Sequence, residues 1–241
     1  MELVFGSVVV AIAAFLAGTT RFRFALISIP FLLLIGFPLE FVVTANLTLL
    51  LITRISVFYR FRNHVSAKRG AMLIFGSLPG LYLGTKVLLR VDPSVIKLSA
   101  GAFVMISALL LLRTVHAPPP ARVLAASAVA GFAGGFLGTT TSLSGIPPVL
   151  LLAHEKAAPV SFLADMAFYF VVSSSVALLL LASQGALATQ ALFPAALIWL
   201  PGAMVGNSLG TTLGPRLPEK TFRYLTLGVV FIAGGITAVT A

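Results

Sequence analysis

The amino-acid sequence predicts an all-α, polytopic integral membrane protein. We expect two inverted repeats, each with a re-entrant or broken helical hairpin and three transmembrane helices, about eight membrane segments in all. Three observations lead to this. Of the 241 residues, 59% are hydrophobic and 9% are charged, whereas soluble domains are about 25% charged. Short polar stretches interrupt the apolar sequence at residues 18–23 and 138–145. The two halves also repeat one order of prolines and glycines.

Composition limits the function classes. The formal net charge is +10, but in an apolar chain basic residues mark cytoplasmic loops, whereas nucleic-acid binding needs a solvated basic face. We therefore expect no nucleic-acid partner. The chain has no cysteine, which excludes disulfides, thiolate ligands and cysteine catalysis. It has no His-Glu-x-x-His or paired-carboxylate motif, which argues against catalysis. We expect no metal or other cofactor. Met1 and Glu2 lack the basic character of a signal peptide, and the first apolar stretch is expected to be retained.

Most of the chain consists of apolar segments long enough to span a membrane, which takes about 20 residues. Six segments meet this length: 39–60, 70–90, 94–113, 159–182, 190–212 and 220–240.

Shorter apolar segments flank each polar stretch. They are residues 3–17 and 24–35 around the first stretch, and 123–137 and 146–153 around the second. Lipid cannot satisfy the backbone groups of a polar turn, so such a turn is tolerated at membrane depth only inside protein or beside a water-filled cavity. We expect two hairpins whose polar tips, at 18–23 and 138–145, are facing halves of one site.

The repeat has an offset of about 120 residues. A proline followed by two glycines occurs in both halves, at a spacing of 122: Pro79, Gly80 and Gly84, then Pro201, Gly202 and Gly206. A proline-rich linker, residues 116–121, separates a first membrane repeat, residues 1–115, from a second, residues 122–241. We interpret the glycines at four-residue spacing as helix-packing positions.

Loop charge favours inverted repeats. The basic loop that contains Arg60, Arg62, Lys68 and Arg69 is expected inside, because lysine and arginine concentrate on the cytoplasmic side. If the hairpins are re-entrant, most of the remaining basic loop residues also fall inside. If the hairpins are full spans, the basic residues divide almost evenly between the two sides.

The first polar stretch contains two arginines, Arg21 and Arg23, beside Thr19 and Thr20. An arginine at mid-membrane costs about 2.5–3.5 kcal/mol on insertion scales, and anion binding is a use that compensates for this. Guanidinium presents a planar fork of donors that fits the oxygens of a small oxyanion. The alternative is that the stretch lies at the surface, where both arginines extend to the headgroups.

The second polar stretch offers hydroxyl donors at Thr139, Thr140, Thr141, Ser142 and Ser144. These hydroxyls could bind an anion without trapping it, or could only bond neighbouring backbone, as serine and threonine do routinely. Asn46 is expected near the same centre. Asp165 lies within a predicted span, where it could carry a coupled proton or hold Arg21, Arg23 or Arg54 in a structural ion pair. We expect Arg54 to be mostly structural, with its charge reaching the interface.

The order of motifs also points to a known family. In the first half the motifs are Gly18, Phe22, Phe24, Pro30, 38–39 and 60–64; in the second they are Gly131, Gly134, Gly138, 145–149, 201–202, 217–219, Phe222 and Arg223. In this order, over nearly the whole chain, the sequence resembles the sulfite exporter TauE/SafE family, also called the toluenesulfonate uptake permeases. The resemblance implies a transporter of sulfite, sulfonates or related organosulfur anions. Arg21 and Arg23 stand where that family tends to have glycine, which leaves the identity of the anion open.

The sequence therefore predicts a multi-pass transporter of the bacterial inner membrane, not an enzyme. Ser144 and His154 are separated by ten residues, about 15 Å along a helix, too far for a serine dyad. We expect a small anionic substrate, alternating access and the lipid bilayer as surroundings; the oligomeric state stays open. The alternatives are a passive anion channel and a transporter of a non-sulfur carboxylate anion.

Overall fold

The structure is a computed structural model, and it describes residues 2–20, 24–92, 94–96, 98–99, 102, 123–155, 158–187 and 189–213. Within these ranges the chain is helical, without strands. The helices are α1 (Glu2–Thr20), α2 (Phe24–Ile35), α3 (Leu39–Phe61), η1 (Arg62–His64), α4 (Ala67–Arg90), α6 (Val123–Thr141), α7 (Ile146–His154), α8 (Pro159–Ser183) and α9 (Thr189–Leu213).

By length and composition, five of the described helices could cross a membrane: Leu39–His64, Ala67–Arg90, Val123–Thr141, Val160–Ser183 and Leu192–Gly210. The predicted spans at 39–60, 70–90, 159–182 and 190–212 are confirmed as helices. Those at 94–113 and 220–240 lie almost wholly outside the described residues. Large apolar side chains point outward, with Phe75, Val129, Leu179 and Phe193 each 69–71% exposed. An outer surface of this kind suits lipid.

The chain forms two compact units, and neither unit is one half of the sequence. Unit 1 contains α1, α2, the first turns of α3 up to Ala45, and α9. Unit 2 contains α3 from Asn46 onward, η1, α4, α6, α7 and α8. Each unit therefore takes helices from both predicted repeats. The linker at 116–121 lies outside the described residues, and the repeat boundaries stay a prediction.

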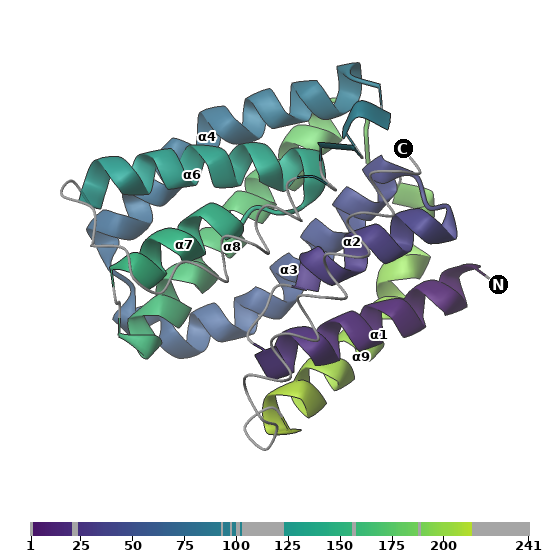
Figure 1. The fold of residues 1–241 in the computed structure, drawn as a ribbon, viewed down its shortest axis with the longest axis horizontal. Helices are drawn as coiled ribbons and strands as arrows, with labels where there is room; N and C mark the ends of the chain where they lie inside the picture. The colour runs from purple at the N-terminus through teal and green to yellow at the C-terminus, as the bar shows by residue number, and fades with distance from the viewer. Residues whose placement is uncertain are drawn as a thin grey trace. The chain divides into compact units, whose positions relative to one another are not determined.

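In unit 1, α1 and α9 pack side by side (Figure 1). The contact is close because Gly206 faces α1 with no side chain; a Cβ there would collide with the carbonyl oxygen of Ala11. Trp199 is fully buried and donates a hydrogen bond from Nε1 to the Leu3 carbonyl, 2.9 Å away. Phe41 packs edge-on to the same indole, with 5.7 Å between the ring centroids.

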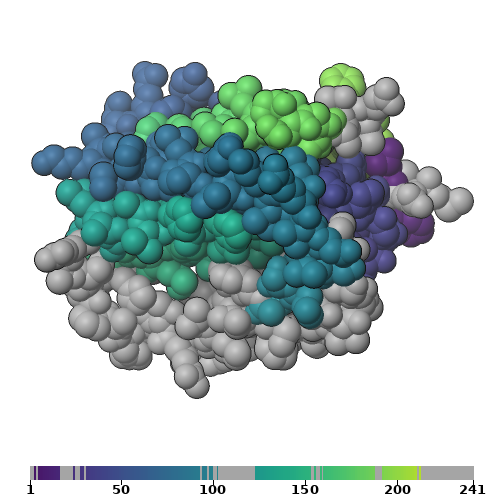
Figure 2. Space-filling model, turned by 90° about the horizontal axis from the view of Figure 1, so that it is seen from above, coloured from purple at the N-terminus to yellow at the C-terminus, as the bar shows by residue number. Residues whose placement is uncertain are grey.

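In unit 2, α4 packs between α6 and α8 (Figure 2). Successive glycines of α4 meet successive turns of α6 in the same order, so the two helices run parallel. The contacts join Gly76 to Ala128, Gly80 to Phe132 and Phe136, and Gly84 to Phe136 and Thr139. A Cβ at any of these glycines would meet backbone atoms of α6. Glycine is required here because the two backbones touch.

The two helix pairs correspond to each other. Gly202 and Gly206 of α9 lie 122 residues after Gly80 and Gly84 of α4. In unit 1 they meet Ala11 and Phe15 of α1, residues that lie 121 positions before the α6 contacts Phe132 and Phe136. Each unit thus contains a parallel pair made by the last described helix of one predicted repeat and the first helix of the other. In each pair the repeated glycines are the positions where the two helices pack, as the sequence indicated.

Candidate functional site

The second polar stretch lies at the turn of a helical hairpin in unit 2. Helix α6 ends at Thr141, and α7 folds back along it (Figure 1). The return is close because Gly134 has no side chain; a Cβ there would lie 2.5 Å from the Ser144 carbonyl oxygen and 3.1 Å from Pro148 Cδ. Ser142 has a φ of 55°, a left-handed conformation uncommon outside glycine. Every residue from 139 to 144 is buried, so a polar turn lies inside protein.

We expected the first arm of this hairpin to end at residue 137. Instead α6 continues to Thr141, and within its last turn Thr140 and Thr141 each donate a hydroxyl hydrogen bond to a carbonyl one turn earlier, at 2.9 Å. Thr139 donates to the Leu81 carbonyl of α4, at 3.2 Å. A hydroxyl has one hydrogen to donate. In this conformation the threonine hydroxyls are therefore engaged with backbone and are not available as anion donors.

Ser144 differs from these threonines. Its hydroxyl oxygen is buried and has no hydrogen-bond partner among the described residues. Its carbonyl accepts a hydrogen bond from the Tyr169 hydroxyl of α8, at 3.2 Å. The turn is thereby held against α8 while the Ser144 hydroxyl remains free to donate.

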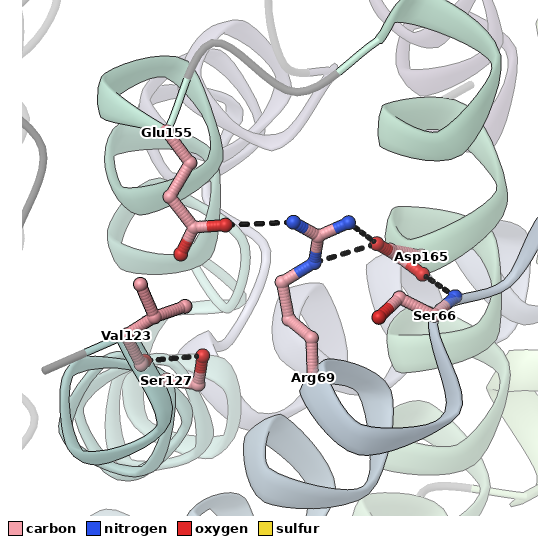
Figure 3. A network of polar contacts seen from close by, with 6 residues as sticks. All are labelled: Ser66, Arg69, Val123, Ser127, Glu155 and Asp165. Atoms are coloured by element: carbon pink, nitrogen blue, oxygen red, sulfur yellow. Dashed lines mark hydrogen bonds and ion pairs between the residues drawn. The ribbon is translucent and has the colours of Figure 1, made fainter.

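A charged cluster joins α4, α7 and α8 at one end of unit 2 (Figure 3). Arg69 donates from Nε to Asp165 Oδ2 at 2.8 Å and from Nη1 to Glu155 Oε2 at 2.7 Å. Its Nη2 lies 2.5 Å from Asp165 Oδ2. The second oxygen of Asp165, Oδ1, accepts the Ser66 backbone N–H at 2.7 Å, at the start of α4. Asp165 is fully buried.

This cluster has two carboxylates and one guanidinium, so its formal charge is −1 and it is not suited to binding an anion. It shows which arginine pairs with Asp165 in the described part of the chain: Arg69, rather than Arg54. Arg21 and Arg23, the other expected partners, lie outside the described residues. Sequence reasoning counted Arg69 only as a loop charge and did not consider Glu155. The scarcity of acidic residues, six in the whole chain, was the signal that could have drawn attention to Glu155.

Arg54 lies on α3, also in unit 2. Its Cζ is 5.8 Å from the centroid of the Phe170 ring of α8. Its Nε is buried and has no hydrogen-bond partner among the described residues, where the arginine also forms no ion pair. The guanidinium we expected to reach the interface therefore packs on an aromatic face.

A comparison with protein families identifies the chain. The model of the family described as Sulfite exporter TauE/SafE matches residues 7–236. The chain belongs to this family. Neither the curated proteins nor the solved structures contain a significant match. The resemblance predicted from the sequence is confirmed, and membership of a transporter family agrees with the expectation that the chain is not an enzyme.

The glycines that carried the TauE/SafE resemblance in the second half are packing positions of the hairpin. Gly131 faces the Leu73 carbonyl of α4, and Gly138 faces Ser144, where a Cβ would approach the serine Cβ to 2.8 Å. With Gly134, they form the face of α6 on which the turn and α4 rest. These motifs are therefore needed to build the buried turn.

The remaining predicted residues are placed only in part. Asn46 is buried on α3. Thr19 and Thr20 belong to the last turn of α1, and their side chains are outside the described set. Within the part of the chain that the structure describes, no group of three or more His, Asp or Glu side chains could hold a metal ion.

Proposed function

We propose that the protein transports a small sulfur oxyanion or organosulfur anion, such as sulfite or a sulfonate, across the bacterial inner membrane by alternating access. Membership of the TauE/SafE family supports the substrate class. The observation that carries the proposal is the buried polar turn at 142–145, which lies between two apolar helices. Backbone of this kind is tolerated in a membrane protein where it lines a substrate path.

The hairpin is proposed to be re-entrant. Helix α6 runs parallel to α4, so the two helices begin at the same end of unit 2. Glu155, just after α7, contacts Arg69 in the first turn of α4. The segment from Val123 to Glu155 therefore starts and finishes at one end of the unit (Figure 3). A matching hairpin from α1 and α2, in an inverted repeat, completes the proposed architecture of about eight segments.

The proposed binding shell takes residues from both hairpins and from α3. It consists of Thr19, Thr20, Arg21, Arg23, Asn46, Thr139, Thr140, Thr141, Ser142 and Ser144. Because the threonines of α6 donate to backbone in the described conformation, they contribute to the shell only when the turn rearranges. Asp165 and Glu155 share Arg69; a proton on Glu155 would weaken the attachment of α7 to α4, and a proton on Asp165 would weaken that of α8 to α4. This is the proposed route for proton coupling.

Flux in proteoliposomes tests the function. Uptake of radiolabelled sulfite and of methanesulfonate should saturate with concentration, and acetate should compete weakly. Strong competition by acetate favours the carboxylate alternative. A rate that rises linearly with concentration favours a passive channel. Arg21→Ala and Arg23→Ala test the first hairpin, and unchanged saturable uptake in both variants would remove these arginines from the proposed shell.

A further inference from the structure

Serine hydroxyls on the described helices usually donate to a carbonyl one turn earlier. Ser77, Ser127, Ser175 and Ser183 do so at 2.7–2.9 Å. Ser173 and Ser174 of α8 do not. They are 2% and 1% exposed, and neither hydroxyl has a hydrogen-bond partner among the described residues. A buried polar group left without a partner costs about 1–3 kcal/mol, so two such groups side by side indicate a place that a ligand completes.

The two serines lie one turn along α8 from Phe170, the residue that Arg54 contacts. The rings of Phe58 and Phe168 stack with centroids 5.7 Å apart, and Arg54 lies over the ring of Phe170. These contacts show that α3 and α8 run antiparallel. Ser173 and Ser174 follow Phe170 by three and four residues, so they lie on the same side of α8, about 5–6 Å further along. The Arg54 Nε, like the two hydroxyls, is a buried donor without a partner.

No carboxylate competes for this arginine within unit 2. The only acidic residues in that unit are Glu155 and Asp165, and both are bound to Arg69. Among the described residues of unit 2, the charge of Arg54 therefore has no carboxylate partner beside the apolar ring of Phe170. A guanidinium and two hydroxyls in a poorly solvated place form a donor set for a small oxyanion.

We propose that Arg54, Ser173 and Ser174 form an anion-binding site within unit 2, which takes a tetrahedral or pyramidal sulfur oxyanion such as a sulfonate or sulfite. The substrate class rests on the proposed transport function; the site itself rests on the unpartnered donors. Tyr169, which precedes Phe170, bonds the carbonyl of Ser144. Helix α8 therefore contacts both Arg54, through Phe170, and the hairpin turn, through Tyr169.

Anion-dependent stabilisation of the purified full-length chain in detergent tests the site. The midpoint of thermal unfolding is measured against increasing sulfite and, separately, methanesulfonate, since a ligand that binds the folded state raises it. The half-saturating concentration should rise about tenfold or more in Arg54→Gln. It should rise about two- to tenfold in Ser173→Ala and Ser174→Ala. Arg54→Lys keeps the charge but not the fork, and should give an intermediate value.

The chain offers matched controls. Arg60 lies on the same helix with its Cζ 5.5 Å from the Phe61 ring centroid, but it is exposed. Ser175 adjoins the two serines and already donates to Val171. Arg60→Gln and Ser175→Ala should leave the half-saturating concentration unchanged.

The outcomes separate the site from the transport function. The proposed site is overturned if Arg54→Gln leaves the half-saturating anion concentration unchanged. It is also overturned if no anion shifts the unfolding midpoint of the wild type. In either case, saturable flux in liposomes would still support the transport function. Anion binding that is lost in Arg54→Gln, in a protein that moves no anion into liposomes, supports the site and overturns transport. If Arg54→Gln does not purify as a folded protein, Arg54→Lys and Ser174→Ala decide the question.

Discussion

Replacing Asp165 by asparagine should strongly destabilise the protein. Asp165 is fully buried and accepts hydrogen bonds from the Ser66 backbone N–H and from Arg69 Nε, at 2.7 and 2.8 Å. Asparagine keeps the size of the side chain but removes its charge. Arg69 then retains only one carboxylate partner, Glu155. Breaking a buried ion pair from one side costs about 3–5 kcal/mol.

This loss can be measured as a change in the thermal unfolding midpoint of the purified protein. For chains of this length, 1 kcal/mol corresponds to about 2–4 °C, so the midpoint should fall by about 6–20 °C. Glu40→Gln is the matched control, because Glu40 lies in the first turn of α3, is only half-buried, and forms no ion pair among the described residues. Its midpoint should stay within about 2 °C of the wild type.

A double-mutant cycle identifies the cause. Arg69→Leu should destabilise as strongly as Asp165→Leu, and the double variant should lose clearly less than the sum of the two, because neither then leaves the other's charge without its partner. An Asp165→Asn midpoint within 2 °C of the wild type would refute the reasoning. So would additive losses in the cycle.

Three further predictions concern packing and the hairpin turn. Gly80→Val should destabilise by about 1–3 kcal/mol or more, since its side chain meets the backbone of α6, whereas Ala71→Val at an exposed position of α4 should have little effect; chemical denaturation of the two variants compares them. Trp199→Phe removes the hydrogen bond of a buried indole and should cost about 1–3 kcal/mol, measured in the same way, while Leu197→Phe at an exposed site of α9 should be neutral. Tyr169→Phe should cost about 0.5–1.5 kcal/mol and alter the KM for sulfite, because it frees the hairpin turn from α8; an unchanged KM would mean that the turn does not need this bond.

Much of the helical framework could be predicted from local sequence. The apolar lengths of α3, α4, α8 and α9 predict helices because a membrane span needs about 20 apolar residues. The repeated glycines, such as Gly80 and Gly202, also correctly predicted helix-packing positions. Their spacing places small residues on one helix face, and the structure uses that face for contact between backbones.

The details of the site could not be predicted, for two physical reasons. Thr140 and Thr141 are polar residues that indicated a break, yet both belong to α6, where their hydroxyls bond carbonyls of the preceding turn. A threonine hydroxyl can bond backbone within a helix or outside one, so composition alone does not specify where the helix ends. The pairing of Asp165 with Arg69 joins residues 96 positions apart, and it follows from how α8 packs on α4.

The division into two units could likewise not be predicted from sequence patterns. A repeat in sequence predicts two similar halves, but not which helices associate. Here α1 packs with α9 in one unit, and α4 packs with α6 in the other. Both pairs use glycines of the later helix of one repeat against the first helix of the other, a preference visible only when the contacts are known.

Counterflow in proteoliposomes most directly tests whether the chain is an alternating-access transporter of a sulfur oxyanion. Vesicles loaded with unlabelled sulfite are diluted into a trace of radiolabelled sulfite, with empty vesicles as the comparison. Alternating access predicts a transient accumulation of label in the loaded vesicles, which saturates with internal sulfite and is weakened in Arg54→Gln but not in Arg60→Gln. Equal uptake of label by loaded and empty vesicles would contradict it.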